Sequence, residues 1–399
     1  MSQASARTDK LAAQGGGVVF CGIFLNEAET IVQTLDSCRE VLDCVAFLDT
    51  GATDGTPDLV RKWLSDNGVP GVVYTCPWPE LAKALGLRRR KNGETALFDF
   101  ARARNLAQAL ALNHCPKPEQ WWLLEADGRW LLQGPVDGVR DALAETPQRC
   151  TAYDLAVRQP GSSLDYLRLR RASECGPGKW QWQHALHEQL WRTDDATVGS
   201  MGGVHFWHEA EPNEQRRWRW ERDLLVLEEM LEQAHEDLAA APESAMAKAT
   251  VARILFYRAQ TYDCLDMYPE ALAAYLERDK VQGSANESGV AMFRAGRLAY
   301  RLKKYADAEK YWIKAHAYYG RPEPLWALAE LCAEQQPAIS GSGKRSQHYA
   351  RLAFECSQRV PIAKEFADPR AWALARFGPA ADNLEVTARE AHLRLLVGA

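Results

Sequence analysis

The feature that most constrains the fold is a fourfold alternation of apolar runs with helical patterns in the first third of the chain. The run VVFCGIFL at 18–25 is apolar throughout and rich in strand formers, which is typical of a strand buried on both faces. Similar runs are CVAFLDT at 44–50, GVVYTC at 71–76 and WWLLEAD at 121–127. Helical patterns separate the runs, so we expect an α/β domain with a mostly parallel sheet.

The helix between the second and third runs is the best marked of these helical patterns. Thr56 suits the N-cap and Pro57 the first helical position, while Asp58 suits the positive end of the helix dipole. Gly68 can end the helix. A second helix is expected in FARARNLAQALALN, at 100–113, directly before the fourth strand.

Polar residues follow three of the predicted strands at the point where each strand ends. Asn26 and Glu27 follow the first strand, Asp49 lies at the end of the second, and Glu125 and Asp127 at the end of the fourth. Ligands of open parallel sheets bind beyond the carboxyl ends of the strands. We therefore predict a functional site at this edge.

The phosphate-binding motifs of two large enzyme classes are missing from the sequence. No glycine-rich dinucleotide fingerprint follows the first strand, and no Walker loop occurs. A Rossmann dehydrogenase or a P-loop NTPase is therefore not indicated. A divalent cation held by carboxylates is the usual alternative for meeting phosphate charge.

The composition limits the partners and the compartment. The net charge of the 399-residue chain is −5, so a wide nucleic-acid surface is not indicated, and we interpret the basic clusters at 88–91 and 216–219 as solvated surface. The ten cysteines include no CxxC pair, which favours buried free thiols in a reducing compartment. We expect a disordered tail over 1–16, no signal peptide, no transmembrane segment and a cytoplasmic protein.

Four stretches of the sequence resemble, in the correct order, the motifs of family-2 glycosyltransferases with the GT-A fold. They are CGIFLNEAETIVQTLDSC, FLDTGATDGT, ARARNLAQA and WWLLEAD. The second resembles the VDDGSTDGT signature, with Thr50 replacing its second Asp, and the last resembles the DxD motif, with Glu125 replacing its first Asp. The segments HALHEQLW, GGVHFWHEAEP and RWERDLLVLEEML resemble a subgroup with C-terminal tetratricopeptide-like helices.

This resemblance implies a GT-A domain over 17–212 that acts as a soluble, metal-dependent, inverting glycosyltransferase. The donor would be a nucleotide-diphosphate-sugar, with a UDP-sugar favoured, and the acceptor a glycan or a protein. By the resemblance, Asp127 would coordinate Mn²⁺ or Mg²⁺, and Glu125 would hold the donor ribose or a metal-bound water. His205 would either supply a further metal ligand, with His208 as the alternative ligand, or have a structural role.

The resemblance also assigns residues to the nucleoside. Asn26, Glu27 and Asp49 would line the base pocket, where a carboxylate can accept a hydrogen bond from an imide N–H. Arg104 would face the base or the diphosphate, and its alternative is a helix-surface arginine. Asp54 is expected to fix the turn after the second strand.

An inverting displacement needs a base for the acceptor hydroxyl. Glu188, in LHEQ, is the predicted base because it matches the family's His-Glu pair, and His187 would position the base or reach the donor. Asp194 and Asp195 are alternatives.

Two further features lie upstream of this pair. Trp180 and Trp182 would either stack on a sugar face or pack in the core. Alternating segments flank a Pro-Gly-Ser-Ser turn within 151–173, which predicts an antiparallel hairpin.

The second half of the sequence, 213–399, is predicted to be a helical tetratricopeptide-like repeat domain. One apolar helix face is formed by Leu224, Leu227, Leu231, Ala234 and Leu238. The stretch YPEALAAY from Tyr268 recurs as YADAEKYW from Tyr305, a spacing close to the tetratricopeptide period of about 34 residues. Such repeats bind acceptors or brace a neighbouring domain.

Two other functions stay open at this level. The departures at Thr50 and Glu125 are compatible with an inactive GT-A domain in a tetratricopeptide-type interaction protein. Nucleotidyl transfer, which would cleave between the donor phosphates, is a third reading.

Overall fold

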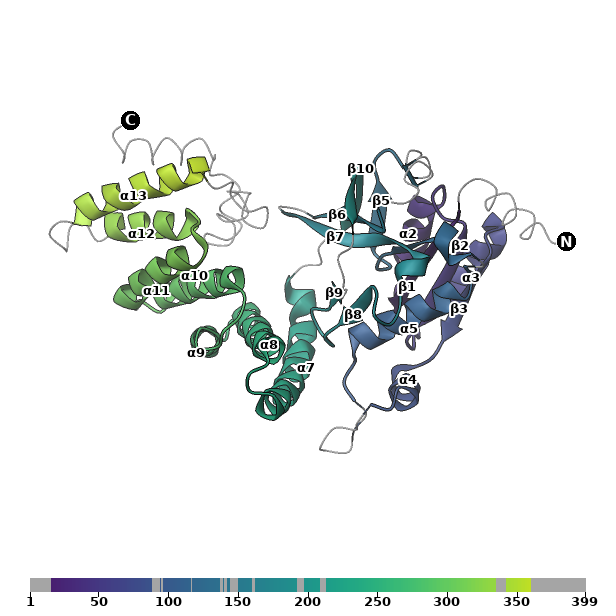
Figure 1. Ribbon diagram of the computed structural model, residues 1–399, viewed down its shortest axis with the longest axis horizontal. Helices are drawn as coiled ribbons and strands as arrows, with labels where there is room; N and C mark the ends of the chain where they lie inside the picture. Colours follow the sequence, from purple (N-terminus) through teal and green to yellow (C-terminus); the bar gives the residue numbers. More distant parts are fainter. Residues whose placement is uncertain are drawn as a thin grey trace. The chain divides into compact units, whose positions relative to one another are not determined.

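The computed structural model divides the chain into two compact units, residues 1–210 and 211–399, which we describe separately (Figure 1). The described residues are 16–87, 94, 96–115, 117–136, 139, 142–143, 150–159, 162–191, 197–208, 213–334 and 342–359. The predicted tail, except Gly16, the basic cluster at 88–91, and Asp194 and Asp195 lie outside the described residues.

The first unit is built on an eight-stranded sheet with the order β3-β2-β1-β4-β7-β6-β10-β5. Its first four strands pair in parallel, which confirms the four predicted strands and their direction. They are β1 (Val18–Phe24), β2 (Cys44–Asp49), β3 (Gly71–Thr75) and β4 (Trp122–Glu125).

The other half of the sheet is mixed, so the expectation of a mostly parallel sheet holds only for the first half. Antiparallel pairing joins β4 to β7, β7 to β6 and β10 to β5, and the β6–β7 pair confirms the predicted hairpin. These strands are β5 (Trp130–Gln133), β6 (Ala152–Gln159), β7 (Ser162–Arg171) and β10 (Val198–His208). A separate antiparallel pair is formed by β8 (Gln181–Gln183) and β9 (Gln189–Trp191).

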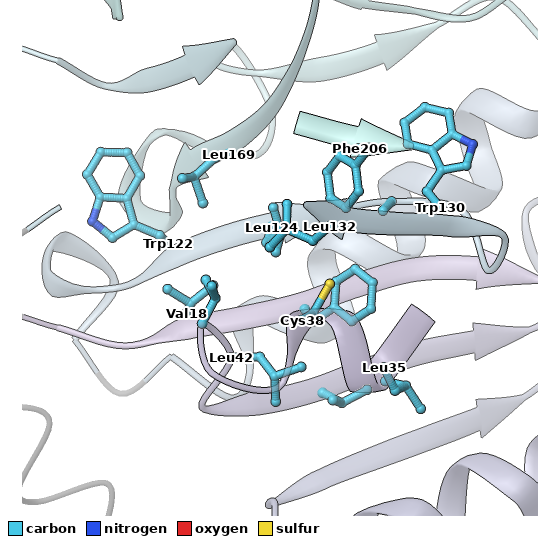
Figure 2. Close-up of a cluster of buried hydrophobic side chains, with 14 of the residues drawn as sticks. Val18, Leu35, Cys38, Leu42, Trp122, Leu124, Trp130, Leu132, Leu169 and Phe206 are labelled. Carbon is cyan, nitrogen blue, oxygen red and sulfur yellow. The ribbon is translucent and has the colours of Figure 1, made fainter. Parts of the chain in front are cut away.

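Helices cover both faces of the parallel half. On one face, Val18, Phe20 and Phe24 of β1 pack against α2 (Ile31–Cys38) and α3 (Thr56–Asn67), in the apolar cluster that Figure 2 shows. On the other face, alternate residues of β1 pack against α5 (Phe100–Leu112), with α4 (Trp78–Ala84) nearby. Burial on both faces explains why these strands read as continuous apolar runs.

Helix α3 begins one residue earlier than predicted. Gly55, at φ 86°, is the N-cap, and Gly68, at φ 60°, ends the helix in the left-handed conformation as expected. The Thr56 hydroxyl is used elsewhere: it accepts from the Glu27 N–H at 2.8 Å and donates to Asp54 at 2.5 Å. The predicted role of Asp54 in fixing the turn is thereby confirmed.

The second unit is helical throughout its described residues, as predicted. Its helices are α7 (Asn213–Ala240), α8 (Ala245–Cys264), α9 (Tyr268–Arg278), α10 (Ala285–Arg301), α11 (Tyr305–Tyr319), α12 (Glu323–Glu334) and α13 (Ser342–Arg359). The repeated alanines, Ala271 of α9 and Ala308 of α11, are both completely buried, which fits close packing between neighbouring helices. The tetratricopeptide type of the repeat stays a prediction.

The cysteines bear out their predicted state. All ten are free thiols, and seven of them are buried. Within the described parts of the chain, we find no helix that is long and apolar enough to span a bilayer.

Candidate active site

The parallel half of the sheet brings the predicted polar residues to one edge. Phe24, the last residue of β1, pairs with Asp49 of β2, and Cys21 of β1 pairs with Glu125 of β4. Asn26 and Asp127 each lie two residues beyond the ends of their strands. The strand-end residues therefore belong to one surface of the first unit.

The two carboxylate oxygens of Asp49 differ in their hydrogen bonds. Oδ1 accepts hydrogen bonds from the backbone N–H groups of Gly51 at 3.0 Å and Ala52 at 2.7 Å, which fixes the loop after β2. Oδ2 is buried and accepts no hydrogen bond from the described residues. Buried acceptors normally have a donor, so an N–H group of a ligand would satisfy this atom.

Asn26 and Glu27 tie the loop after β1 to its neighbours. Asn26 has a left-handed backbone, with φ 54°, and its side-chain oxygen accepts from the Thr53 N–H at 2.8 Å. Glu27 accepts from Arg129 Nε at 2.7 Å and from the Thr30 hydroxyl at 3.1 Å. Both side chains thus hold the rim of the strand-end surface in place.

Arg104 of α5 is the centre of the site. Its Nε donates to Glu188 at 2.8 Å, its Nη1 to Glu125 at 3.1 Å and its Nη2 to Asp127 at 2.7 Å. The side chain is buried, so the alternative of a helix-surface arginine is wrong. Burial by itself lowers the pKa of Arg104, but the charges of Asp127, Glu188 and Glu125 raise it well above its ordinary value, and the guanidinium stays charged.

A second arginine, Arg170 of β7, completes the network and is not among the site residues predicted from the sequence. It is fully buried and donates through Nη2 to Glu125 at 2.5 Å and to Gln108 at 3.2 Å. Trp182 Nε1 donates to the same Glu125 oxygen at 3.0 Å. Glu125, itself buried, therefore accepts from two arginines and one indole.

Helix α5 is fixed to β8 on the same side as Arg104. The Asn105 side chain both donates to and accepts from the backbone of Trp182, at 2.8 and 2.9 Å, and Gln108 donates to the Trp180 carbonyl at 3.0 Å. The indole of Trp182 lies under the guanidinium groups of Arg104 and Arg170. Both tryptophans are buried, which favours the packing alternative over sugar stacking.

The predicted His-Glu pair lies in the turn between β8 and β9. Glu188 contacts Arg104, as described, and its side chain is partly buried. His187 has a left-handed backbone, with φ 52°. The structure therefore brings Arg104, Glu125, Asp127 and Glu188 together, as the motifs suggested.

The two candidate histidines of β10 pair with different residues of β5. His205 pairs with Gln133 and its Nδ1 lies 3.1 Å from the Gly203 carbonyl, whereas His208 pairs with Trp130. The Trp130 N–H donates to the Asp127 carbonyl, so this register favours His208 as the histidine nearer to Asp127. Within the described ranges there is no group of three or more His, Cys, Asp or Glu residues that could hold a metal ion.

Two signals in the sequence could have revealed the missed residues. Gln108 follows Arg104 by one helical turn and therefore lies on the same face of α5. Arg170 alternates with leucines in β7, and an arginine within a buried strand needs an acid partner.

None of the known protein-family models matches the sequence, and no curated protein matches it. Among solved structures, the chain is similar to glucosyl-3-phosphoglycerate synthase from Mycobacterium tuberculosis, in a crystal structure with Mn²⁺ and uridine-diphosphate-glucose. The TM-score is 0.24 at 15% sequence identity, over 40% of this chain and 49% of that chain. The match thus spans about half the length of that enzyme.

Proposed function

We propose that the first unit transfers a sugar from a nucleotide-diphosphate-sugar, with a UDP-sugar favoured, to a hydroxyl group of a glycan or protein acceptor. The observation that carries the proposal is the buried Asp49 Oδ2, which accepts no hydrogen bond from the described residues. The imide N–H of a uracil base would donate to this atom. Asn26 and Glu27, which the loop contacts hold at the same edge of the sheet, would complete the base pocket.

The carboxylates at the end of β4 differ in their fit to a divalent cation. Asp127 has a side chain that is 37% exposed, and Mg²⁺ or Mn²⁺ is commonly held by one or two carboxylates together with substrate phosphates. Glu125 does not fit as a ligand, because its oxygens already accept from Arg104, Arg170 and Trp182. A cation held by Asp127 with His208 or His205 would offset the charge of the diphosphate. Metal dependence stays a prediction.

Glu188 is the proposed base. In the transfer, the acceptor oxygen attacks the anomeric carbon and its proton passes to the Glu188 carboxylate. The bond from the anomeric carbon to the phosphate oxygen breaks, and its electron pair leaves with the nucleoside diphosphate, which inverts the anomeric centre. Arg104 Nε orients the base through its contact with Glu188. The acceptor itself would be recognised with help from the helical repeats.

Calorimetry with a panel of nucleoside diphosphates tests the proposal, and Asp49→Asn makes the test specific. The amide of this variant can direct N–H toward the base, which opposes a uracil imide but suits cytosine N3. We expect the variant to lose at least about tenfold in UDP affinity and to gain in relative CDP affinity. The matched control is Asp58→Asn, whose carboxylate is exposed on α3.

A wild-type protein that binds no nucleoside diphosphate would overturn the proposal and leave the inactive, interaction-protein alternative. The departure at Thr50 does not by itself favour that alternative. The Thr50 hydroxyl is buried and donates to the Phe24 carbonyl at 3.1 Å, so this residue has a structural role between β1 and β2.

A further inference from the structure

Arg104 and Arg170 are both buried at the proposed donor site, and no sequence motif assigns a role to Arg170. We infer that Arg170 and Glu125 are positioning residues that hold the Arg104 guanidinium in place for the donor diphosphate. The inference rests on the proposed function, because the inference assumes that Arg104 faces the diphosphate of the donor.

Arg104 has hydrogen-bonding capacity left for a ligand. A guanidinium carries five N–H groups, and the three contacts to Glu125, Asp127 and Glu188 use one on each nitrogen. One N–H therefore remains on Nη1 and one on Nη2. A planar donor pair of this kind matches phosphate oxygens only when its plane is fixed.

Glu125 is the partner that fixes this plane. Of the three carboxylates around Arg104, Glu125 has the least exposed side chain, at 2%, against 16% for Glu188 and 37% for Asp127. Glu125 is also held from two other sides, because Arg170 and Trp182 both donate to its Oε2 atom. Trp182 donates to it and also lies under the Arg104 guanidinium.

Arg170 acts through Glu125 and not on the donor. Its side chain is completely buried, and it binds the Oε2 atom of Glu125, while Arg104 binds Oε1. Arg170 also supplies a second positive charge to a cluster of three carboxylates, which one arginine could not neutralise. The sheet places it there, because Arg170 of β7 neighbours Leu123 of β4 and Glu125 lies on the same face two residues further along.

The competing reading is that this ion pair only stabilises the fold. Replacement of a buried ion pair by apolar residues of similar volume is often neutral for stability, whereas removal of one partner is not. The double variant Glu125→Leu/Arg170→Met should therefore melt closer to wild type than Arg170→Met alone. Its donor site would nevertheless lack the contact that orients Arg104.

The decisive measurement is the ratio of UDP affinity to uridine affinity, by calorimetry at fixed pH and Mn²⁺ concentration. Uridine lacks the diphosphate, so loss of Arg104 orientation should weaken UDP and spare uridine. We expect the double variant to lower the ratio at least about tenfold. The matched control is Arg171→Met, because Arg171 neighbours Arg170 but donates to the Glu119 carbonyl and stacks on Trp122; its ratio should equal that of wild type.

The possible results of this experiment distinguish a failure of the inference from a failure of the proposed function. An unchanged ratio in a folded double variant would overturn the inference while wild-type UDP binding keeps the proposed function. An equal loss of UDP and uridine affinity would also overturn it, because a Glu125 that held the ribose would weaken both ligands alike. If wild type binds neither ligand, the proposed function and this inference are both wrong. Partial recovery of the ratio in Arg170→Lys would support the positioning role.

Discussion

Two arginines, one in each unit, are completely buried and have very different surroundings. Arg278 of α9 donates to the carbonyls of Val281 at 3.1 Å and Ser284 at 3.2 Å, both in the loop that follows its own helix. Arg170 reaches Glu125 and Gln108, which come from distant parts of the sequence. Arg278 therefore stabilises the loop that follows its own helix, whereas Arg170 joins separate elements at the strand-end surface.

The electrostatics of the two arginines differ in the same way. Burial lowers the pKa of Arg278, and the nearest charge, Glu287, lies 3.7 Å away. Burial also acts against charge on Arg170, yet Glu125 raises its pKa above the ordinary value. Equal burial therefore does not imply an equal role: long-range charge pairing at a sheet edge points to function, and local carbonyl contacts point to structure.

The largest effect is expected from Arg104→Met, which leaves three carboxylates around an apolar side chain. Loss of one partner of a buried ion pair costs about 3–5 kcal/mol, so the free energy of unfolding should fall by this amount and UDP affinity at least about a hundredfold. Urea titration and calorimetry measure the two changes. Arg102→Met is the control on the same helix, since that arginine is half exposed; a similar loss in both variants would contradict the role of Arg104.

The comparison of the two buried arginines is tested directly with the variants Arg170→Met and Arg278→Met. The first should lower the free energy of unfolding by about 3–5 kcal/mol and weaken UDP, because it leaves part of the Glu125 charge unpaired. The second should cost about 2–3 kcal/mol, since it removes contacts to two carbonyls, and leave UDP affinity unchanged. Weaker UDP binding by Arg278→Met would contradict the comparison, because it would mean that the loop contacts of Arg278 also affect donor binding.

A smaller loss is expected from overpacking the helical unit alone. Ala308→Leu inserts a large side chain at a completely buried position, which typically costs about 1–3 kcal/mol. Thermal unfolding of this variant and of Ala306→Leu, an exposed position on the same helix, measures the difference. An equal melting temperature for the two would mean that the repeated alanine does not mark a close packing contact.

The smallest predicted effect is a gain in stability from Glu323→Gln in α12. Burial raises the pKa of Glu323, and both of its carboxylate oxygens are buried without a hydrogen-bond donor among the described residues. Because the folded-state pKa lies above the unfolded value, stability falls as the pH rises through the folded-state pKa. The variant should therefore melt a few degrees above wild type at pH 7 and level with it near pH 4. A constant difference at both pH values would exclude this titration as the cause.

The sequence predicted the parallel half of the sheet well, because strands covered on both faces are continuous apolar runs. Arg104, Glu125, Asp127 and Glu188 were also predicted, through motif order. Arg170 was missed because its alternation with leucines suggests a strand with one solvated face, while the sheet inserts β7 between β4 and β6. Motif order also could not separate His205 from His208, since that depends on the pairing of β10 with β5.

The order of the sheet has a consequence for how the chain folds. Strand β1 pairs with β4, which follows two strands and four α-helices later, so the first unit cannot close its sheet before most of its chain has emerged. The helices of the second unit pack on their immediate neighbours in sequence. Chains rich in local contacts fold faster than those that depend on distant pairings. In pulsed hydrogen exchange, amides of α8 to α11 should become protected before those of β1 and β4, and the cluster around Arg104 should be among the last parts to form.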